Sequence, residues 1–418
     1  MCDFDLMSSP FPDVRMHGFT RRHTVQAALD WLDDQLQPLD AEEVPLLEAA
    51  GRVLAAAVVS TVDVPQFDRA TMDGYAVVAE TTEGATPYNR MPLTVVGQAM
   101  PGSPCERVVR PGDAIRIMTG APMPPGANAV LPAESAEADH ADAARITAIA
   151  PVGPGRNVGR RGEDISAGAS LLEPGRVIRP QDVGVMSSIG LRLIPVVRRP
   201  RVRLVVTGNE LLPAGSAPRG YQITDSNGPM LAALAERDGA SVDFPGLVRD
   251  DADTILAALQ ADADAVIVSG GSSVGIEDLA PLLVATHGEL AVHGIAMRPS
   301  SPTGLGRVGR RLVFLLPGNP VSALCAYDFF AGRAIRVLGG RAAAWPYRPA
   351  RGTLTRKISS PIGRLDYARV RVHDGRVEPL SVSGASVLSS TTRADGFVIV
   401  PDDSEGFPAG ADVEVWLY

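Results

Sequence analysis

Hydrophobic positions follow a helical period near the start of the chain and change to a β pattern further on. Between residues 24 and 57, VQAALDWLDDQLQ and EEVPLLEAAGRVLA repeat apolar residues at helical spacing, which predicts two helices. From about residue 62 to 150, short β-rich segments such as YAVVA, LTVVG and DAIRIMTG are separated by Gly and Pro turns. This pattern predicts a small β domain. Residues 1–17 have neither pattern and are expected to form a flexible tail.

The most regular pattern begins near residue 194. Apolar, β-branched runs such as RVRLVVTG and DAVIVSGG alternate with helical segments such as DSNGPMLAALAERDG and DDADTILAALQ. Strands that are apolar throughout and alternate with helices form a mostly parallel sheet covered on both faces. We expect RRLVFLLPGNP to end the sheet and VSALCAYDFFAGRAIRVLGG to be the closing helix. Ser226 or Asn227 is expected to cap the first helix of this series, and Gly239 to end it.

Together these patterns predict a multidomain protein of the α/β plus β class. A length of 418 residues fits roughly two to four domains. After residue 150 the chain returns to a turn-rich, partly helical pattern, which suggests that the β domain is an insertion. The expected parts are the tail (1–17), an elongated, partly helical linker domain that is discontinuous (18–61 and 151–193), the inserted β domain (62–150), a three-layer α/β domain with a mostly parallel sheet (194–342) and a second small β domain of hairpins (343–418).

Net charge excludes one class of partner. A formal net charge of -9 argues against a general nucleic-acid surface, which needs clustered positive charge. Arginines do cluster locally, at residues 160–161 and 198–203. Such clusters are compatible with a small anionic ligand, although solvated surface arginines are the simpler explanation.

Cysteine and histidine usage indicates the compartment. Cys2, Cys105 and Cys325 form no CxxC pair, and the six histidines include no HExxH motif. We therefore expect a reducing compartment and neither disulfides nor a zinc site. No apolar run has membrane-spanning length, and the first fifteen residues lack the apolar core of a signal peptide. The sequence predicts a cytoplasmic protein without a membrane partner.

Two loops of the α/β domain have the composition of anion-binding loops. In an open parallel sheet, ligands bind outside the carboxyl ends of the strands, and both loops follow such ends. Glycines let backbone N–H groups approach an anion and hydroxyls can donate as well, although a tight turn or a plain helix entry has the same composition. The candidate substrate-binding residues are Ser269, Gly270, Gly271, Ser272, Ser273 and Gly275 of SGGSSVG, and Pro317, Gly318, Asn319, Pro320 and Ser322 of PGNPVS.

Acidic residues occur once in each of four loops at the same strand ends. They are Glu210, Asp225, Asp250 and Asp278, and Asp251 is nearly equivalent to Asp250. Each alone is most simply a helix cap or a solvated acid. Four carboxylates at one edge, beside phosphate-type loops, favour an Mg²⁺ site that bridges a nucleotide.

A third loop at this edge, GIAMRPSSPTGLG (residues 294–306), also has the pattern of an anion site. It follows a buried strand and carries a positive charge at Arg298. After that residue it continues with Ser300 and Ser301, and it contains no lysine.

Seven segments in order resemble the successive signatures of a known family. They are ATMDGYAVVA, IRIMTGAPMPPGANAVLPAE, GRRGEDISAG, VVTGNELL, TDSNGPML, SGGSSVGIED and LPGNPVSALCAYDFF. The chain resembles, from about residue 20 to its C-terminus, the molybdopterin molybdenumtransferases, which insert molybdenum during cofactor biosynthesis. The E domain of gephyrin is a relative.

This resemblance implies a fold, a reaction and partners. It implies four domains, the last of them a β-barrel, and a homodimer whose active site lies between the α/β domain of one subunit and the inserted domain of the other. Members of the family bind adenylylated molybdopterin, cleave its phosphoanhydride with the help of Mg²⁺ and place molybdate on the dithiolene, which yields molybdenum cofactor and AMP. The molybdopterin adenylyltransferase and molybdoenzyme apo-proteins are the candidate protein partners.

The resemblance also implies roles for residues that composition alone would leave as turn residues. Asp73 of MDGY and Thr119 of MTGA would be catalytic and would act on the site of the other subunit. Asp164 of GED, in the returning linker segment, would be catalytic as well.

In the α/β domain, the resemblance assigns the carboxylates and the loops. Glu210, Asp250 and Asp278 would hold Mg²⁺ or order the attacking water, so that Glu210 is both a metal ligand and a catalytic residue. The SGGSSVG loop and residues 317–322 would hold phosphate and pterin. This assignment agrees with the chemistry, because a metal ion neutralises the charge that develops on cleaved phosphates.

Two departures from the family pattern leave alternatives open. Residues 298–302 usually read Lys-Pro-Gly-Lys-Pro, and the lysines help to attract molybdate and the cofactor phosphate. Here Arg298 keeps the charge in a planar form that is not equivalent to an ammonium, and Ser301 keeps only a donor. A smaller departure is Asn128, where Asp is usual.

Because the presumed Mg²⁺ carboxylates are all present, the sequence favours a working molybdenum insertase. One alternative is a molybdopterin adenylyltransferase, whose fold resembles residues 194–340 alone, but the additional domains argue against it. The other alternative is a specialised or non-catalytic paralogue, either a molybdopterin-binding scaffold or an enzyme that uses tungstate, and the loop without lysine favours it.

Overall fold

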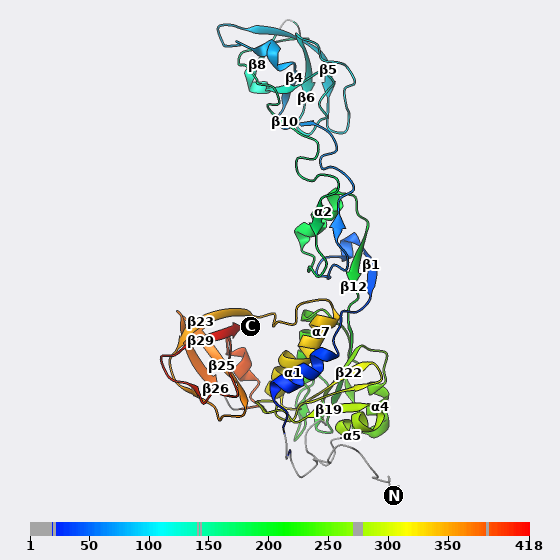
Figure 1. Ribbon diagram of the computed structural model, residues 1–418, viewed down its shortest axis with the longest axis vertical. Coiled ribbons are helices and arrows are strands. Elements are labelled where there is room, and N and C mark those ends of the chain that lie inside the picture. Colours follow the sequence, from blue (N-terminus) through cyan, green and yellow to red (C-terminus); the bar gives the residue numbers. More distant parts are fainter. Residues whose placement is uncertain (1–18, 20–21, 140–141, 143, 271–278, 382–383) are drawn as a thin grey trace. The chain divides into compact units, whose positions relative to one another are not determined.

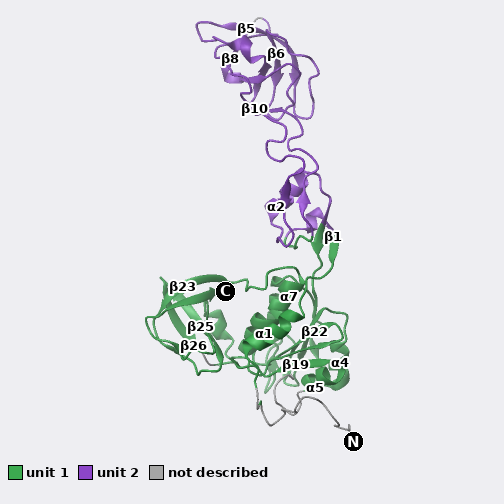
Figure 2. Ribbon diagram, viewed as in Figure 1, with its two compact units in different colours: residues 1–43, 51–55, 195–418 green, residues 44–50, 56–194 purple. Residues whose placement is uncertain are grey.

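The chain folds into two compact units. The computed structural model describes residues 19, 22–139, 142, 144–270, 279–381 and 384–418. Unit 1 comprises residues 1–43, 51–55 and 195–418, and unit 2 comprises residues 44–50 and 56–194 (Figure 2). The finer division into four domains stays a prediction. None of the helices in the described part of the chain combines the length and apolar character needed to cross a membrane.

Unit 2 contains the predicted small β domain. Its six-stranded sheet has the order β7-β4-β6-β5-β9-β8, and two apolar clusters pack on it. The strands are β4 (Gly74–Val77), β5 (Met91–Ala99), β6 (Asp113–Ile117), β7 (Ala129–Pro132), β8 (Ala136–Ala138) and β9 (Arg145–Ala148), with the short helices η2 (Ala79–Thr82) and η3 (Ala133–Ser135).

The second predicted helix near the start of the chain is wrong. The first forms as α1 (Val25–Asp34), but residues 41–45 are strand β1 (Ala41–Pro45), followed by a single 3-10 turn, η1 (Leu46–Glu48). Pro45 has no N–H to donate and clashes with the preceding turn of a helix. Gly51 then takes a left-handed conformation with φ 77°, so the apolar spacing between these two residues cannot continue as a helix.

The remaining elements of the predicted linker are short. Pro180 starts its one longer helix, which runs to Ser188, and the Asp182 carboxylate in its first turn accepts from Arg179 N–H at 2.9 Å. The elements are β2 (Val58–Val59), β10 (Val158–Gly159), β11 (Ser170–Leu172), α2 (Pro180–Ser188) and β12 (Leu193–Val197), which begins at the end of the linker. Strand β3 (Arg69–Ala70) of the predicted β domain pairs with β10.

Unit 1 is built on the predicted α/β sheet, whose order is β16-β13-β18-β22-β21-β19. The first four of these strands run parallel, and β21 is antiparallel to both of its neighbours. The strands are β13 (Arg201–Thr207), β16 (Ser241–Asp243), β18 (Ala265–Ser269), β19 (Glu289–His293), β21 (Gly304–Val308) and β22 (Arg311–Leu316), with β17 (Leu247–Val248) beside β13 and the separate pair β14 (Leu211–Leu212) and β15 (Ile223–Thr224).

Along the chain, β22 is the last strand of this sheet, as predicted, but in space the sheet does not end with it. Two antiparallel strands, β21 and β19, extend the sheet beyond it. Glycine is depleted in strands, so GLGRV has the composition of a turn. Gly306 is required by packing, because a Cβ there would lie 2.2 Å from the Glu289 carbonyl oxygen and 2.9 Å from Val284 Cγ1.

Helices cover both faces of this sheet, which confirms the three layers. Successive residues of β18 point to opposite clusters: Ile267 belongs to one and Val268 to the other. The first cluster includes α1, α3, α6 and α7, and the second includes α4 and α5 (Figure 1). The helices are α3 (Asn227–Arg237), α4 (Ala252–Leu259), α5 (Ala280–His287), α6 (Pro320–Ala326), the π-helix η4 (Tyr327–Ala331) and α7 (Gly332–Leu338).

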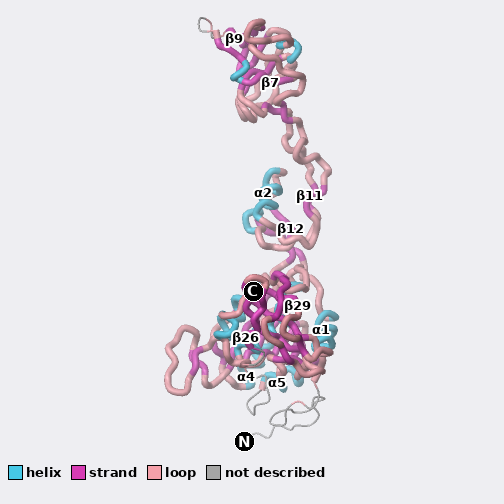
Figure 3. The backbone as a smooth tube through the Cα atoms, turned by 90° about the vertical axis from the view of Figure 1, so that its left-hand side faces the viewer, coloured by secondary structure: helices cyan, strands magenta, loops and turns pink. Residues whose placement is uncertain are grey.

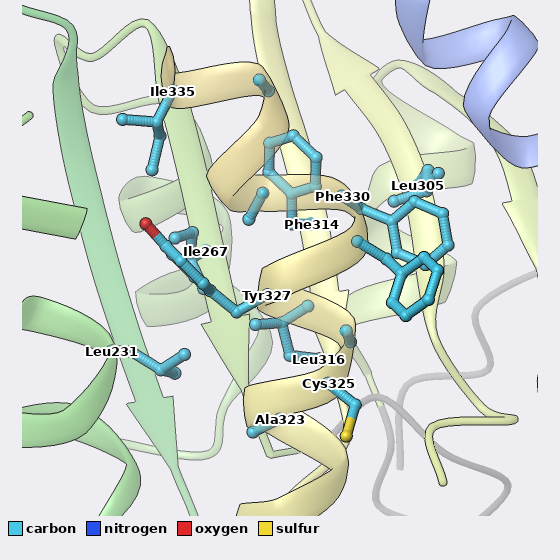
Figure 4. Packing of buried hydrophobic residues seen from close by; sticks show 14 of the residues in the cluster. Leu231, Ile267, Leu305, Phe314, Leu316, Ala323, Cys325, Tyr327, Phe330 and Ile335 are labelled. Carbon is cyan, nitrogen blue, oxygen red and sulfur yellow. The ribbon is translucent and has the colours of Figure 1, made fainter. Parts of the chain in front are cut away.

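The predicted closing helix is continuous but contains a π-turn. Helix α6 passes through η4 into α7, and the side chains of Tyr327 and Phe330 pack against Phe314 and Ile267 of the sheet (Figure 4). The cap prediction for α3 needs correction. Ser226 occupies the N-cap position without a side-chain bond, and Asp225 supplies the cap instead by accepting from Gly228 N–H at 2.9 Å.

The C-terminal part of unit 1 is a closed barrel. Its strand order is β25-β26-β23-β29-β27, and pairing of β25 with β27 closes it; Figure 3 shows this strand-rich part beside α1. A short strand of the α/β domain, β20 (Met297–Arg298), adds to β25 in parallel. The barrel elements are β23 (Arg348–Leu354), β25 (Leu365–His373), β26 (Arg376–Ser381), β27 (Gly396–Val400) and β29 (Asp412–Leu417), with the pair β24 (Ile358–Ser359) and β28 (Gly406–Phe407) and the helix α8 (Ser389–Thr392).

Candidate functional site

Three parallel strands end together at one edge of the α/β sheet. In the register of the sheet, Val206 of β13 pairs with Ser269 of β18, and Ser269 pairs with Leu316 of β22. Gly270 follows with φ 93°, and a Cβ there would lie 2.2 Å from the Thr207 carbonyl oxygen. The first glycine of the predicted SGGSSVG loop is therefore required by a close backbone approach. The rest of that loop, including Gly271, Ser272, Ser273, Gly275 and Asp278, lies outside the described residues.

Asn227 links these strand ends through its side chain. Its Nδ2 donates to Ser269 Oγ at 2.9 Å and to the Gly318 carbonyl at 2.8 Å. The Asn227 Oδ1 and the Thr207 Oγ1 are both buried, and neither of them makes a hydrogen bond within the described part of the chain. Buried polar groups are nearly always satisfied in native proteins, so these two atoms mark a place where a polar ligand can bind. We call Thr207, Asn227, Ser269 and Gly318 the strand-end cluster.

A polar pocket of about 440 Å³ lies next to this cluster in unit 1. Residues 296–302 form one wall and the segment that opens α6 forms another. We call it the arginine pocket, because it is lined by Arg22, Arg298 and Arg364, by Pro299, Ser300, Ser301 and Pro302, by Pro317, Asn319 and Ser322, and by Ala296, Met297, Gly363, Gly384 and Ala385.

The Arg298–Pro302 wall is held in a fixed conformation. Ser300 has φ 90°, which is rare for a residue other than glycine and costs on the order of 1–3 kcal/mol. Its Oγ donates to the Ser322 carbonyl at 2.5 Å, and its own carbonyl accepts from Thr303 Oγ1 at 2.8 Å. The Ser301 carbonyl accepts from Ile295 N–H. Ser301 Oγ, in contrast, is buried and makes no hydrogen bond to any described residue.

The arginine pocket carries net positive charge. Arg364 makes a bidentate ion pair with the buried Asp366, at 2.7 and 3.0 Å. Over the described residues, Arg22 and Arg298 make no ion pair, and no Asp or Glu lines the pocket. A polar cavity with two uncompensated guanidinium groups and a free hydroxyl is suited to an oxyanion.

In unit 2, the structure brings Asp73 and Thr119 together. The Asp73 carboxylate accepts from both the backbone N–H and the hydroxyl of Thr119, each at 2.7 Å, and both residues are exposed. These two bonds, the backbone one first, lower the pKa of Asp73 below its ordinary value. Two turns far apart in the sequence thus present one ionised, oriented carboxylate. Asp164 is also exposed.

Replacing Thr119 with valine is expected to raise the pKa of Asp73 part of the way back to its ordinary value. Valine keeps the size and the backbone N–H of threonine and removes only the hydroxyl, so one of the two hydrogen bonds remains. NMR titration of the Asp73 carboxyl carbon measures the effect, and Thr119→Ser, which keeps the hydroxyl, is the control. An identical Asp73 pKa in the valine variant would show that the hydroxyl bond is not formed in solution.

The predicted acidic residues divide into helix caps and candidate ligands. Asp225 caps α3, and Asp251 caps α4 by accepting from the N–H and the hydroxyl of Thr254 at 2.9 and 2.8 Å. These bonds lower the pKa of Asp251. Glu210 is exposed and folds back over Gly208. In the described ranges, which omit Asp278, no three His, Cys, Asp or Glu residues lie close enough to hold a metal ion.

Asn128, a departure from the family pattern, has a local explanation. Its Oδ1 accepts from Ala79 N–H at 2.7 Å, and its Nδ2 donates to the Glu80 carboxylate at 3.2 and 3.4 Å. An aspartate could make the first bond but would repel Glu80. This substitution is therefore matched to its neighbour in unit 2.

Fold and site together define a class of protein: a multidomain α/β plus β protein whose strand-end cluster and arginine pocket are suited to an anionic small molecule. Comparison with known families identifies the parts. Residues 23–190 match the MoeA N-terminal region (domain I and II), residues 203–336 match a probable molybdopterin binding domain, and residues 351–418 match the MoeA C-terminal region (domain IV).

Curated relatives and a solved structure agree over nearly the whole chain. Molybdopterin molybdenumtransferase 2 of Mycobacterium tuberculosis is 36% identical over 386 residues, which is 89% of this chain and 94% of the relative. A molybdopterin molybdenumtransferase of Staphylococcus aureus is 30% identical over 402 residues, 94% and 95% of the two chains. The molybdopterin biosynthesis MoeA protein of Pyrococcus horikoshii superposes with a TM-score of 0.80 at 32% identity, over 95% of this chain and 99% of that one.

The chain belongs to the molybdopterin molybdenumtransferase family and is an enzyme of molybdenum cofactor biosynthesis. The predicted family and fold class are therefore confirmed. Sequence reasoning missed Asn227, which was considered only as a helix cap, and Arg22. Asn227 lies in TDSNGPML, one of the segments that resemble the family, and this was a signal for it. Nothing in the sequence pointed to Arg22.

Proposed function

We propose that the chain inserts molybdenum into adenylylated molybdopterin, with Mg²⁺, and releases AMP. The observation that carries this proposal is that one segment serves two neighbouring sites. In residues 317–322, Gly318 belongs to the strand-end cluster, while Asn319 and Ser322 line the arginine pocket. A phosphate-bearing pterin in the cluster and a tetrahedral oxyanion in the pocket would thus lie side by side, and proximity of two reactants is a large part of catalysis.

Within this proposal, Ser269, Gly270 and the SGGSSVG loop bind the phosphates of the substrate. Arg298 and Ser301 bind molybdate. The buried, unsatisfied Thr207 Oγ1 and Asn227 Oδ1 support a polar ligand beside them.

Mg²⁺, when bound, would neutralise the charge that develops on the cleaved phosphates. Its proposed ligands are Glu210, Asp250 and Asp278. Of the two neighbouring aspartates, Asp251 is engaged in capping α4, which makes Asp250 the better candidate.

We also propose that the enzyme is a homodimer, in which Asp73 and Thr119 of one subunit, with Asp164, act on the substrate bound by the other. The oriented and ionised carboxylate of Asp73 fits a group that must accept or position a proton. The proposed substrate donor is the molybdopterin adenylyltransferase, and molybdoenzyme apo-proteins are the proposed recipients of the cofactor.

A second candidate is a specialised paralogue, which binds molybdopterin without turnover or uses tungstate. The observation that favours it is that the pocket wall holds Ser300 and Ser301 where the family usually has glycine and lysine.

The function is tested with purified chain, adenylylated molybdopterin and Mg²⁺, by following AMP release and active cofactor against molybdate concentration. We expect both products from the native chain, none after chelation of Mg²⁺, and a KM for molybdate that falls about two- to tenfold in Ser301→Lys, because the lysine adds a cation beside the oxyanion. Products only in Ser301→Lys, or only with tungstate, would favour the specialised paralogue. If AMP were released but no active cofactor formed with either molybdate or tungstate, molybdenum insertion would be contradicted.

A further inference from the structure

Residues 22–24, which we call the N-terminal segment, lie along the residues that lead into the arginine pocket. His23 N–H donates to the Gly294 carbonyl at 2.9 Å, and the His23 carbonyl accepts from Ala296 N–H at 2.8 Å. These bonds form a parallel bridge between His23 and Ile295. The position of residue 22 relative to residues 294–298 is therefore set by main-chain hydrogen bonds.

Side chains on both sides of this bridge fix it further. Phe19 packs edge-on against His293, with ring centroids 5.0 Å apart, and a Cβ on Gly294 would lie 2.5 Å from the Phe19 ring. On the other side, Thr24 caps α1 by accepting from Ala27 N–H at 3.1 Å, and α1 buries Leu32 in the main core. The N-terminal segment is thus packed against the rest of unit 1 through both main-chain and side-chain contacts.

This arrangement brings Arg22 to the arginine pocket. Of the three arginines in the lining, Arg364 is engaged by Asp366. Arg298 and Arg22 have no ion-pair partner among the residues that the structure describes, and the buried Ser301 Oγ beside them has no hydrogen-bond partner there either. A tetrahedral dianion matches these groups, because it has two charges to neutralise and four oxygens that accept from guanidinium and hydroxyl donors.

We propose that Arg22 is an oxyanion-binding residue, which together with Arg298 neutralises a tetrahedral dianion in the arginine pocket. The N-terminal segment thus supplies the second positive charge that Ser301 does not. The identity of the anion as molybdate rests on the proposed function, but the binding of a tetrahedral oxyanion by Arg22 does not.

The test measures binding without catalysis, using the full-length chain and molybdate, tungstate or phosphate as probes in calorimetry. Arg22→Ala is expected to raise the Kd for molybdate about 10- to 100-fold, because it removes one of two charge-assisted contacts. Arg348→Ala removes an exposed arginine of the same unit outside the pocket and is expected to leave the Kd unchanged. Ser301→Lys added to Arg22→Ala is expected to restore binding to within a few-fold, because the charge returns to the same pocket.

Anion binding and cofactor formation test the role of Arg22 and the proposed function separately. Equal binding by Arg22→Ala and the native chain, or no binding of any of the three anions by the native chain, would overturn the role of Arg22. Weakened binding that Ser301→Lys does not restore would overturn the idea that Arg22 supplies the missing charge. If Arg22→Ala weakens binding as expected while the native chain forms no cofactor, the inference stands and the proposed function fails.

Discussion

An Asp328→Ala protein is expected to lose about 3–5 kcal/mol of stability in unit 1, because the change removes the acceptor at the centre of a buried polar network. Asp328 lies in the π-helix and is fully buried. Its Oδ1 accepts from Tyr347 OH at 2.8 Å and lies 3.8 Å from an Arg237 nitrogen, and its Oδ2 accepts from Tyr367 OH at 3.4 Å. Without the carboxyl group, the Tyr347 hydroxyl would lose its acceptor and keep only the bond it accepts from Arg237, and the Tyr367 hydroxyl would keep only its bond with Tyr418.

This network connects the closing helix of the α/β domain to the barrel. Tyr347 and Tyr367 come from the barrel side, and Tyr367 also meets Tyr418 OH at 2.8 Å. Next to it, the buried Asp238 accepts from Arg336 at 2.8 Å and from Tyr327 OH at 3.0 Å. Tyr327 and Asp328 both lie in the π-helix, so this irregular turn carries the two residues by which the closing helix enters the network.

Asp328 is also expected to make the stability of unit 1 fall as the pH rises. Burial, the largest cause, raises the pKa of Asp328 from its ordinary value of 3.8 to about 7, although hydrogen bonding from Tyr347 and the charge of Arg237 oppose it. Between these two values the folded state holds a proton that the unfolded state releases. The contribution of Asp328 is therefore complete below about pH 4 and is lost as pH rises toward 7, at up to about 1.4 kcal/mol per pH unit.

Urea unfolding followed by tryptophan fluorescence measures both effects. All three tryptophans, Trp31, Trp345 and Trp416, belong to unit 1, so the signal reports this unit alone. Asp328→Asn keeps an acceptor but cannot ionise. It is expected to be less destabilised than Asp328→Ala at pH 8 and to lack the fall in unfolding free energy between pH 5 and pH 7. The same fall in native and Asp328→Asn proteins would mean that Asp328 is ionised throughout.

The sequence predicted what depends on local pattern. Apolar runs such as residues 202–206 and 265–268 identified the buried parallel strands, and strand ends identified the rim where Ser269 and Gly318 meet. Local pattern failed where tertiary packing decides. Gly306 lies in a strand where the Glu289 carbonyl leaves no room for a Cβ. Val44 and Leu54 have helical spacing, but Val44 is buried in strand β1 and Leu54 is buried at a β-bridge to Val196.

The parts of the site that could not be predicted arise from contacts between distant segments. Arg22 reaches the arginine pocket only because His23 bonds to residues 294 and 296, and no periodicity encodes that. Family resemblance, and not composition, selected Asp73 and Thr119 as candidate residues, but the hydrogen bonds between them were not predicted. Ser300 is a third case: serine at a left-handed position becomes understandable only when its bond to the Ser322 carbonyl is seen.

An Asn227→Ala protein is expected to lose about 10- to 100-fold in kcat/KM for cofactor formation and roughly 1–3 kcal/mol of stability. The substitution removes both donors of Nδ2, so that Ser269 and Gly318 are no longer tied to each other through α3. Since these residues begin the two loops of the proposed substrate site, a small displacement would move both. Asn227→Asp is expected to be worse, because a carboxylate oxygen would face the Gly318 carbonyl and a charge would be buried.

Ser226→Ala is the matched control, since the neighbouring serine is exposed and its side chain makes no capping bond. It is expected to behave like the native chain in both assays. A structural role for Asn227 would change only the unfolding curve, whereas a role in positioning the loops lowers kcat/KM under conditions where the variant is fully folded. If folded Asn227→Ala were as active as Ser226→Ala, the strand-end cluster would be a packing device, and the substrate phosphates would have to be held by the SGGSSVG loop without it.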